Sequence, residues 1–230
     1  RNLSGPNSNG EEVLDGKIDS QALALRLTHA YDVGGTNLTA VAVLPWANAN
    51  VSPAPLATAM GETQGLMDLR LGLSAWLIND PANAHYLAFS GMLIVPTANY
   101  DSGQTLNVGE NRWKLTLGGG WQKDVASNLI VELSPELVWY GDNADYVGGS
   151  KLEQKPSYAL TGYLRKRLSP ALHVHVGTQI NRGGATRIDG VSQNNPANND
   201  RVMVGTSLYL PKNYQLILRL AKDIGIENGF

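Results

Sequence analysis

The 230-residue sequence contains no cysteine. This absence excludes a disulfide scaffold, a cysteine nucleophile and thiolate-ligated zinc or iron–sulfur sites, and it suits an oxidising compartment. Long apolar runs are missing as well, because the longest one covers only residues 40–47 and contains Pro45. A membrane-spanning helix needs about 20 consecutive apolar residues. The sequence therefore excludes a helical membrane protein.

A strong charge of either sign is also missing. The chain has 18 basic and 20 acidic residues, a net charge of −2 and a mean hydropathy of −0.18. Such a balance provides no basic field for a phosphate backbone, so nucleic acid is not an expected partner. Residues 1–19 lack the central apolar run of a signal peptide.

What the sequence does contain is alternation of apolar and polar residues. In the segment 112–122, for example, Trp113, Leu115 and Leu117 alternate with Arg112 and Lys114. A period of two predicts β-strands, and helical spacing is almost absent, so the fold class is all-β. We predict ten strands, at 22–31, 37–46, 67–77, 85–95, 112–122, 128–139, 156–165, 171–180, 201–210 and 214–223.

The charged residues of these strands lie almost entirely on one face, opposite the Leu, Val and Trp residues. The charged residues on the polar face are Arg26, Asp68, Arg70, Arg112, Lys114, Glu132, Glu136, Arg165, Arg201, Arg219 and Asp223, and only Lys222 lies on the apolar face. A sheet with one apolar and one polar face fits a soluble barrel with the apolar face inside or a membrane barrel with that face outside.

Three features favour the membrane barrel over a soluble barrel or a β-sandwich. The strands are long enough to cross a bilayer, which takes about 9–11 tilted residues. Aromatic residues lie near the strand ends, as interfacial girdles require; they are Tyr31, Trp46, Trp113, Trp121, Trp139 and Tyr214. Short connections (32–36, 78–84, 123–127, 166–170, 211–213) alternate with long ones (47–66, 96–111, 140–155, 181–200).

We therefore predict one antiparallel, up-and-down transmembrane β-barrel domain over residues 1–230. If the short turns are periplasmic, the segment 22–31 starts at the outer side and the segment 214–223 ends there. Single-chain bacterial barrels ordinarily begin and end in the periplasm. We therefore expect a parent barrel of twelve strands, of which this chain shows ten. Direct pairing of 22–31 with 214–223 in a closed ring would contradict this expectation.

Several loop and strand-end motifs resemble a bacterial family of outer-membrane proteins, the meta-pathway phenol-degradation family. The resembling segments are Leu77-Ile78-Asn79-Asp80-Pro81, Val95-Pro96-Thr97 with Tyr100-Asp101, LNVGENRWK at 106–114, WYGDN at 139–143, QKPSY at 154–158, GGATRIDG at 183–190 and DIGIENGF at 223–230. In that family one strand precedes and another follows the part present here, so Phe230 is not expected to be a C-terminal assembly signal. The resemblance implies a Gram-negative outer-membrane channel for aromatic or apolar compounds, without catalytic residues or cofactor.

A barrel of this size leaves its inward side chains to decide what passes. The candidate lumen residues are Arg26, Asp68, Arg70, Arg112, Lys114, Glu132, Glu136, Tyr163, Arg165, His173, His175 and Arg219. Arg112 and Lys114 are expected to face Glu132 and Glu136 across the 123–127 turn. These charges could form a constriction that orders or gates a permeant, or they could be neutralising pairs that stiffen the wall. The need of buried charges for partners favours the second interpretation.

His173 and His175 lie two residues apart on one face, a usable ligand spacing, but nothing in the sequence supplies a third ligand, so no metal is expected. The leading hypothesis is passive uptake of small aromatic or weakly polar molecules. The rivals are a structural barrel with a blocked lumen and a barrel hydrolase that uses these histidines. Outer-membrane lipid and lipopolysaccharide are the expected surroundings, and Arg182 and Arg187 in a long loop could bind lipopolysaccharide phosphates.

Overall fold

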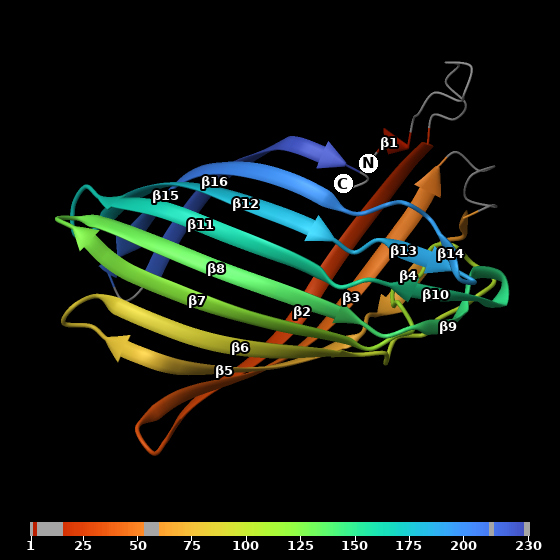
Figure 1. The fold of residues 1–230 in the computed structure, drawn as a ribbon, viewed down its shortest axis with the longest axis horizontal. Coiled ribbons are helices and arrows are strands. Elements are labelled where there is room, and N and C mark those ends of the chain that lie inside the picture. The colour runs from red at the N-terminus through yellow and green to blue at the C-terminus, as the bar shows by residue number, and fades with distance from the viewer. Residues whose placement is uncertain (1, 4–15, 53–59, 212–213, 228–230) are drawn as a thin grey trace.

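The computed structural model describes residues 2–3, 16–52, 60–211 and 214–227. Its main feature is a curved antiparallel sheet of long strands that wraps around a common axis (Figure 1). Each of the ten predicted strands is present. They are β2 (Gly16–Val33), β3 (Thr36–Ser52), β5 (Leu69–Asp80), β6 (His85–Val95), β7 (Lys114–Ala126), β8 (Leu129–Tyr140), β11 (Ser157–Arg167), β12 (Leu172–Gly183), β15 (Asn198–Leu210) and β16 (Tyr214–Glu227).

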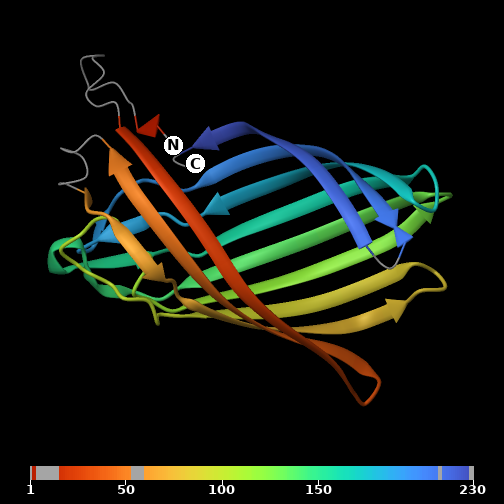
Figure 2. The same cartoon turned by 180° about the vertical axis from the view of Figure 1, so that it is seen from behind.

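Each long strand pairs with the next long strand along the chain, which confirms the up-and-down topology. Two short strands extend the sheet: β1 (Asn2–Leu3) pairs with β2, and β4 (Thr63–Leu66) pairs with β3. The sheet is not closed, because within the described residues β2 and β16 do not pair with each other. Figure 2 shows these two strands from the opposite side of the molecule. A closed ring, in which β2 would pair with β16, would have contradicted a twelve-stranded parent barrel, and it is not observed in the described residues. The count of twelve strands stays a prediction.

The two ends of the sheet differ in the length of their connections, as predicted. One end has short turns, and a two-residue turn joins β2 to β3 through Gly34 and Gly35, with φ of +60° and +85°. Positive φ at both central residues is what a two-residue hairpin needs, and glycine adopts it without steric cost. The carboxylate of Asp32 accepts a hydrogen bond from the Gly35 amide at 3.0 Å. Residues 212–213 of the last short turn lie outside the described residues.

The long connections gather at the other end and form a second sheet in the order β14-β13-β10-β9. Its strands are β9 (Asn143–Tyr146), β10 (Ser150–Gln154), β13 (Thr186–Ile188) and β14 (Val191–Ser192), and the 3-10 helix η1 (Val147–Gly149) follows β9. Their length of two to five residues is too short for a periodic pattern to reveal them. Residues 53–59 and Phe230 lie outside the described residues.

The outward face of the long sheet is an exposed apolar belt. Leu25, Leu164 and Val176 are 62%, 44% and 55% exposed, whereas the inward His173 and His175 are buried. Aromatic side chains border this belt at two levels, Trp46, Trp113 and Trp139 near the long connections and Tyr31 and Tyr214 near the short turns. Polar residues thus point inward and apolar residues outward, as a barrel in lipid requires.

No helix among the described residues has both the length and the apolar character to span a membrane. The first two long strands run further than the sequence predicts. Lys17 pairs with Ser52, and Asp19 with Asn50, beyond the apolar belt. In β3 the alternation continues there with small and apolar residues, and Val51 is buried, so the strand extends past its predicted end.

Candidate lumen site

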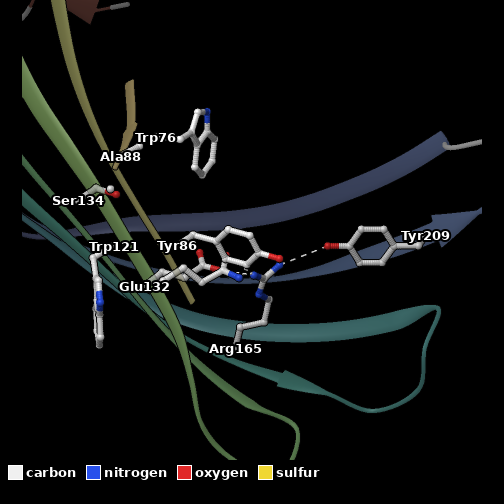
Figure 3. Close-up of a pocket in the computed structure, with 10 residues that line it drawn as sticks. Trp76, Tyr86, Ala88, Trp121, Glu132, Ser134, Arg165 and Tyr209 are labelled. Carbon is white, nitrogen blue, oxygen red and sulfur yellow. Dashed lines mark hydrogen bonds and ion pairs between the residues drawn. The ribbon is translucent and has the colours of Figure 1, made fainter. Parts of the chain in front are cut away.

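The concave side of the sheet contains a chamber of about 450 Å³ in the half nearer the short turns (Figure 3). Its inward lining residues are Trp76, Tyr86, Ala88, Gly120, Gln122, Glu132, Ser134, Arg165 and Tyr209. Figure 3 shows that Trp121, which also borders the chamber, turns its ring away from Arg165. The Trp121 indole nitrogen donates to His85 Nε2 at 3.1 Å. The chamber therefore combines aromatic walls with a polar centre.

Arg165 of β11 is the centre of the polar part. It forms an ion pair with Glu132 of β8. Its guanidinium also donates to the Gln122 side-chain oxygen at 3.0 Å and to the Tyr209 hydroxyl at 3.3 Å. The register explains the meeting of these groups, since Glu132 pairs with both Gln122 and Tyr163, two residues from Arg165. Four strands are thus joined across the lumen wall by one guanidinium.

Small residues provide the empty space of the chamber. Ala88 and Gly120 are register partners on β6 and β7, and a Cβ atom built on Gly120 would have no neighbour within 4 Å. Pairing between β7 and β8 is interrupted between Gly118↔Glu136 and Trp121↔Leu133. Pro135 lies opposite this gap and has no N–H to donate.

His173 and His175 are buried on the inward face of β12, as predicted. Their rings contact aromatic neighbours, Tyr209 at 4.8 Å and Tyr163 at 5.5 Å between centroids. Within the part of the chain that the structure describes, no cluster of three metal-ligating side chains occurs. His173 Nδ1 and His175 Nε2 are buried without a hydrogen-bond partner. No serine or carboxylate oxygen orients either of these nitrogens as a catalytic base would need.

The expectation that Arg112 and Lys114 face Glu132 and Glu136 is wrong. The hairpin register places Lys114 opposite Tyr140, at the far end of β7 from the turn where Glu132 lies. Arg112 and Lys114 instead share Glu110, which sequence reasoning missed. The chain bends between Glu110 and Arg112 at Asn111, where φ is +52°, so alternation provided no signal for this cluster.

Glu110 anchors the connection 96–113 to the mouth of the barrel. Arg112 donates to it at 2.6 and 3.0 Å, and Gln154 of β10 accepts a further bond from Arg112 at 2.6 Å. Burial works to raise the pKa of Glu110, but Lys114 and Arg112 outweigh it and hold this pKa below its ordinary value. Asp68 accepts hydrogen bonds from the backbone of Ala98 and Glu110 at 3.1 and 3.0 Å. The cluster therefore fastens both ends of the connection.

The remaining candidates are spread along the lumen. Arg70 pairs in register with Ile94, which pairs with Lys114, so Arg70 belongs to the level of the mouth. Arg26 donates a hydrogen bond to Thr28 at 3.3 Å. It does not line the chamber around Arg165. Glu136 is exposed on the inward face and has no ion-pair partner among the described residues. Tyr163 and Arg219 stack at 5.2 Å between guanidinium carbon and ring centroid.

Most other lumen arginines pair with a carboxylate. Arg167 binds Asp124 at 2.5 and 2.9 Å, and Arg201 binds Asp223 at 2.6 and 3.1 Å. On the outward face, Arg182 holds Asp200 in the same way, at 2.6 and 3.0 Å, beside its exposed register partner Tyr158. The suggestion that Arg182 and Arg187 bind lipopolysaccharide phosphates stays a prediction. These forked pairs join neighbouring strands and stiffen the sheet.

Comparison with known proteins places this geometry in a family. No curated protein matches the chain. A solved structure described as the crystal structure of the COG4313 outer membrane channel from Pseudomonas putida F1 is similar, with a TM-score of 0.81 and 31% sequence identity over 98% of this chain and 84% of that one. Residues 4–230 match the family model described as "Putative MetA-pathway of phenol degradation". The chain is thus an outer-membrane protein of the β-barrel type, and it belongs to this phenol-degradation family.

Proposed function

We propose that this outer-membrane channel protein takes up small aromatic or weakly polar molecules by passive diffusion. The observation that carries the proposal is the lumen chamber of about 450 Å³, in which aromatic walls surround one hydrogen-bonding centre. Small-molecule sites are typically about 300–1,000 Å³, mostly apolar, with few polar groups that fix orientation. The family description supports an aromatic permeant, and the similar solved structure supports a channel role.

The chamber offers two kinds of contact to such a permeant. The rings of Trp76, Tyr86 and Tyr209 provide aromatic faces. Glu132 accepts and Tyr209 donates or accepts hydrogen bonds, so a phenolic hydroxyl finds partners there. Because these groups already bond to Arg165, a permeant exchanges one bond for another and is held weakly. Weak holding permits release on the other side without cofactor or energy input.

Uptake into vesicles tests this proposal. The full chain is reconstituted into vesicles whose outer leaflet is lipopolysaccharide, which slows spontaneous entry of apolar solutes. We expect labelled phenol to enter faster than through protein-free vesicles, and a sugar to gain little. Planar-bilayer conductance is measured in parallel. Absence of both uptake and conductance would contradict the proposal and favour the rival structural barrel with a blocked lumen.

The role of the polar centre is tested by Glu132→Gln. This change removes the acid that pairs with Arg165 and leaves the guanidinium without a carboxylate partner, bonded to Gln122 and Tyr209. We expect phenol uptake to change by roughly twofold or more, since leaving one member of a part-buried pair costs more than losing the pair. Glu136→Gln is the matched control, because it removes an equal charge from the same strand without breaking an ion pair. Equal effects of both variants would contradict a specific role of the Glu132–Arg165 pair.

A further inference from the structure

We propose that the lumen contains a carboxylate-binding subsite at Arg219 and that the channel therefore prefers aromatic carboxylates over neutral aromatics. This inference rests on the proposed function and specifies its substrate class. A second cavity of about 150 Å³ carries it. This cavity shares Glu132 and Arg165 with the larger chamber, which Figure 3 displays. The two cavities therefore adjoin at one ion pair.

Arg219 is the unusual charge of this second cavity. Arg165, Arg167, Arg182 and Arg201 each form an ion pair with a carboxylate. Arg219 has no carboxylate partner within the described part of the chain and lies over the Tyr163 ring instead. A guanidinium presents a planar fork of donors that matches a carboxylate. The cavity thus offers a cation whose natural partner is left for a ligand to supply.

Arg219 lies on β16, the edge strand of the described sheet, and its register partner on β15 is Gly205. Arg165, His175, Gly205 and Arg219 lie in one row across β11, β12, β15 and β16. Gly205 contributes no side chain to this row, and a Cβ atom there would come within 2.6 Å of His175 Nε2. The imidazole therefore lies across Gly205, with Nε2 buried and unpartnered. This nitrogen and the Ser207 hydroxyl are further polar groups beside Arg219.

The charge pattern assigns the two halves of a ligand to the two cavities. Glu132 borders both cavities and already neutralises Arg165, so Arg219 is the cation of the second cavity that is left for a carboxylate. A carboxylate is attracted to Arg219, while its aromatic ring occupies the larger chamber beside Tyr86 and Tyr209. A neutral phenol has no group that uses Arg219. The expected preferred ligand is therefore a ring with one attached carboxylate, of which benzoate is the simplest probe.

Binding to the full chain in detergent, measured by calorimetry at neutral pH, tests the subsite independently of transport. We expect benzoate to bind more tightly than phenol, and Arg219→Gln to weaken benzoate by roughly tenfold, as loss of about one charge-assisted hydrogen bond would. Phenol binding should be unchanged. Arg219→Lys, which keeps the charge and loses the fork, should fall between. Cyclohexanecarboxylate and acetate probe the contribution of the ring.

Arg26→Gln is the matched control, because it removes an equal charge from a residue that lines neither of the two cavities. Equal loss of benzoate affinity in both variants would show a diffuse positive potential and would overturn the subsite, as would acetate binding as tightly as benzoate. Uptake distinguishes the two proposals. If phenol enters vesicles but benzoate binds no better than phenol, only this inference fails. If benzoate binds through Arg219 but neither compound enters, the subsite stands and the proposed function fails.

Discussion

Gly120 shows how a residue shapes the lumen through the side chain it lacks. It lies opposite Ala88 in the sheet, and no atom approaches the position that its Cβ would take. Large inward residues at these two positions would fill the chamber, because the lumen of a barrel of moderate size is decided by its side chains. Glycine weakens a strand because it has low β-propensity and no side chain to pack. Its effect at position 120 is to leave the chamber open.

Gly120→Leu should therefore narrow the chamber without unfolding the barrel. We expect conductance and phenol uptake to fall by roughly a factor of two or more, because the new side chain enters the empty space. Gly119→Ala is the control: its Cβ points to the other face and meets only ordinary contacts at 3.5 Å and beyond. Unchanged transport in Gly120→Leu with a folded barrel would show that the chamber is not on the permeation path.

Residue faces could be predicted from the sequence, but residue partners could not. Alternation assigned Glu132, Arg165 and His175 to the lumen because a period of two is a local property. The partner of Glu132 depends on the register with the neighbouring long strand, β11, which the pattern of a single strand does not contain. The error at Arg112 has the same origin. Its true partner, Glu110, lies in a connection where no periodicity constrains the side chain.

The connection 96–113 is the element that the charged cluster at the mouth controls. Asp68 binds the backbone at two points of it, and Glu110 joins it to β7 and, through Arg112 and Gln154, to β10. Val108 is 7% exposed within this connection, so part of it is packed rather than solvated. The connection is therefore held in place at the mouth of the barrel.

Acidification should loosen this connection. The pKa of Glu110 is lowered from its ordinary value of 4.5, so the folded state binds this proton less readily than the unfolded chain. The stabilisation is then fully present above pH 4.5 and is lost as the pH falls through the lower folded pKa. Because Glu110 is 46% exposed, solvent screening limits the effect to roughly 1 kcal/mol.

Limited proteolysis between residues 96 and 111 measures this effect. We expect faster cleavage of the wild-type protein by an acid-stable protease below pH 4.5 than at neutral pH. Glu110→Gln should already be cleaved faster at neutral pH and should lose most of the pH dependence. Glu153→Gln, which removes a carboxylate from an exposed pair with Lys151, is the control. A Glu110→Gln variant with the pH profile of the wild type would contradict the assignment.

At the scale of the whole molecule, the outward apolar face defines how the barrel meets the membrane. Leu160 and Ala159 are neighbours on β11 that point to opposite faces, and Leu160 is 44% exposed on the outside. Leu160→Arg should lower the stability of the inserted barrel by about 2–4 kcal/mol, the cost of a cation facing lipid. Ala159→Arg places the same group in the lumen opposite the unpaired Glu136 and should be tolerated. Urea unfolding in lipid vesicles measures both variants, and equal destabilisation would contradict the assignment of faces.

The orientation of the barrel follows from the same asymmetry of connections that indicated it in the sequence. In outer-membrane barrels the long connections lie on the extracellular side and the short turns lie on the periplasmic side. Because the chain has no cysteine, single-cysteine variants report one position each. Gln193 lies in a long connection, Ala82 lies in the turn between β5 and β6, and both side chains are exposed. The two test variants are Gln193→Cys and Ala82→Cys. A bulky maleimide should label Gln193→Cys on intact cells and Ala82→Cys only after the outer membrane is opened. The reverse labelling pattern would contradict this orientation. In the predicted orientation, a permeant that enters from outside the cell passes the cluster at Glu110 before it reaches the chamber at Arg165.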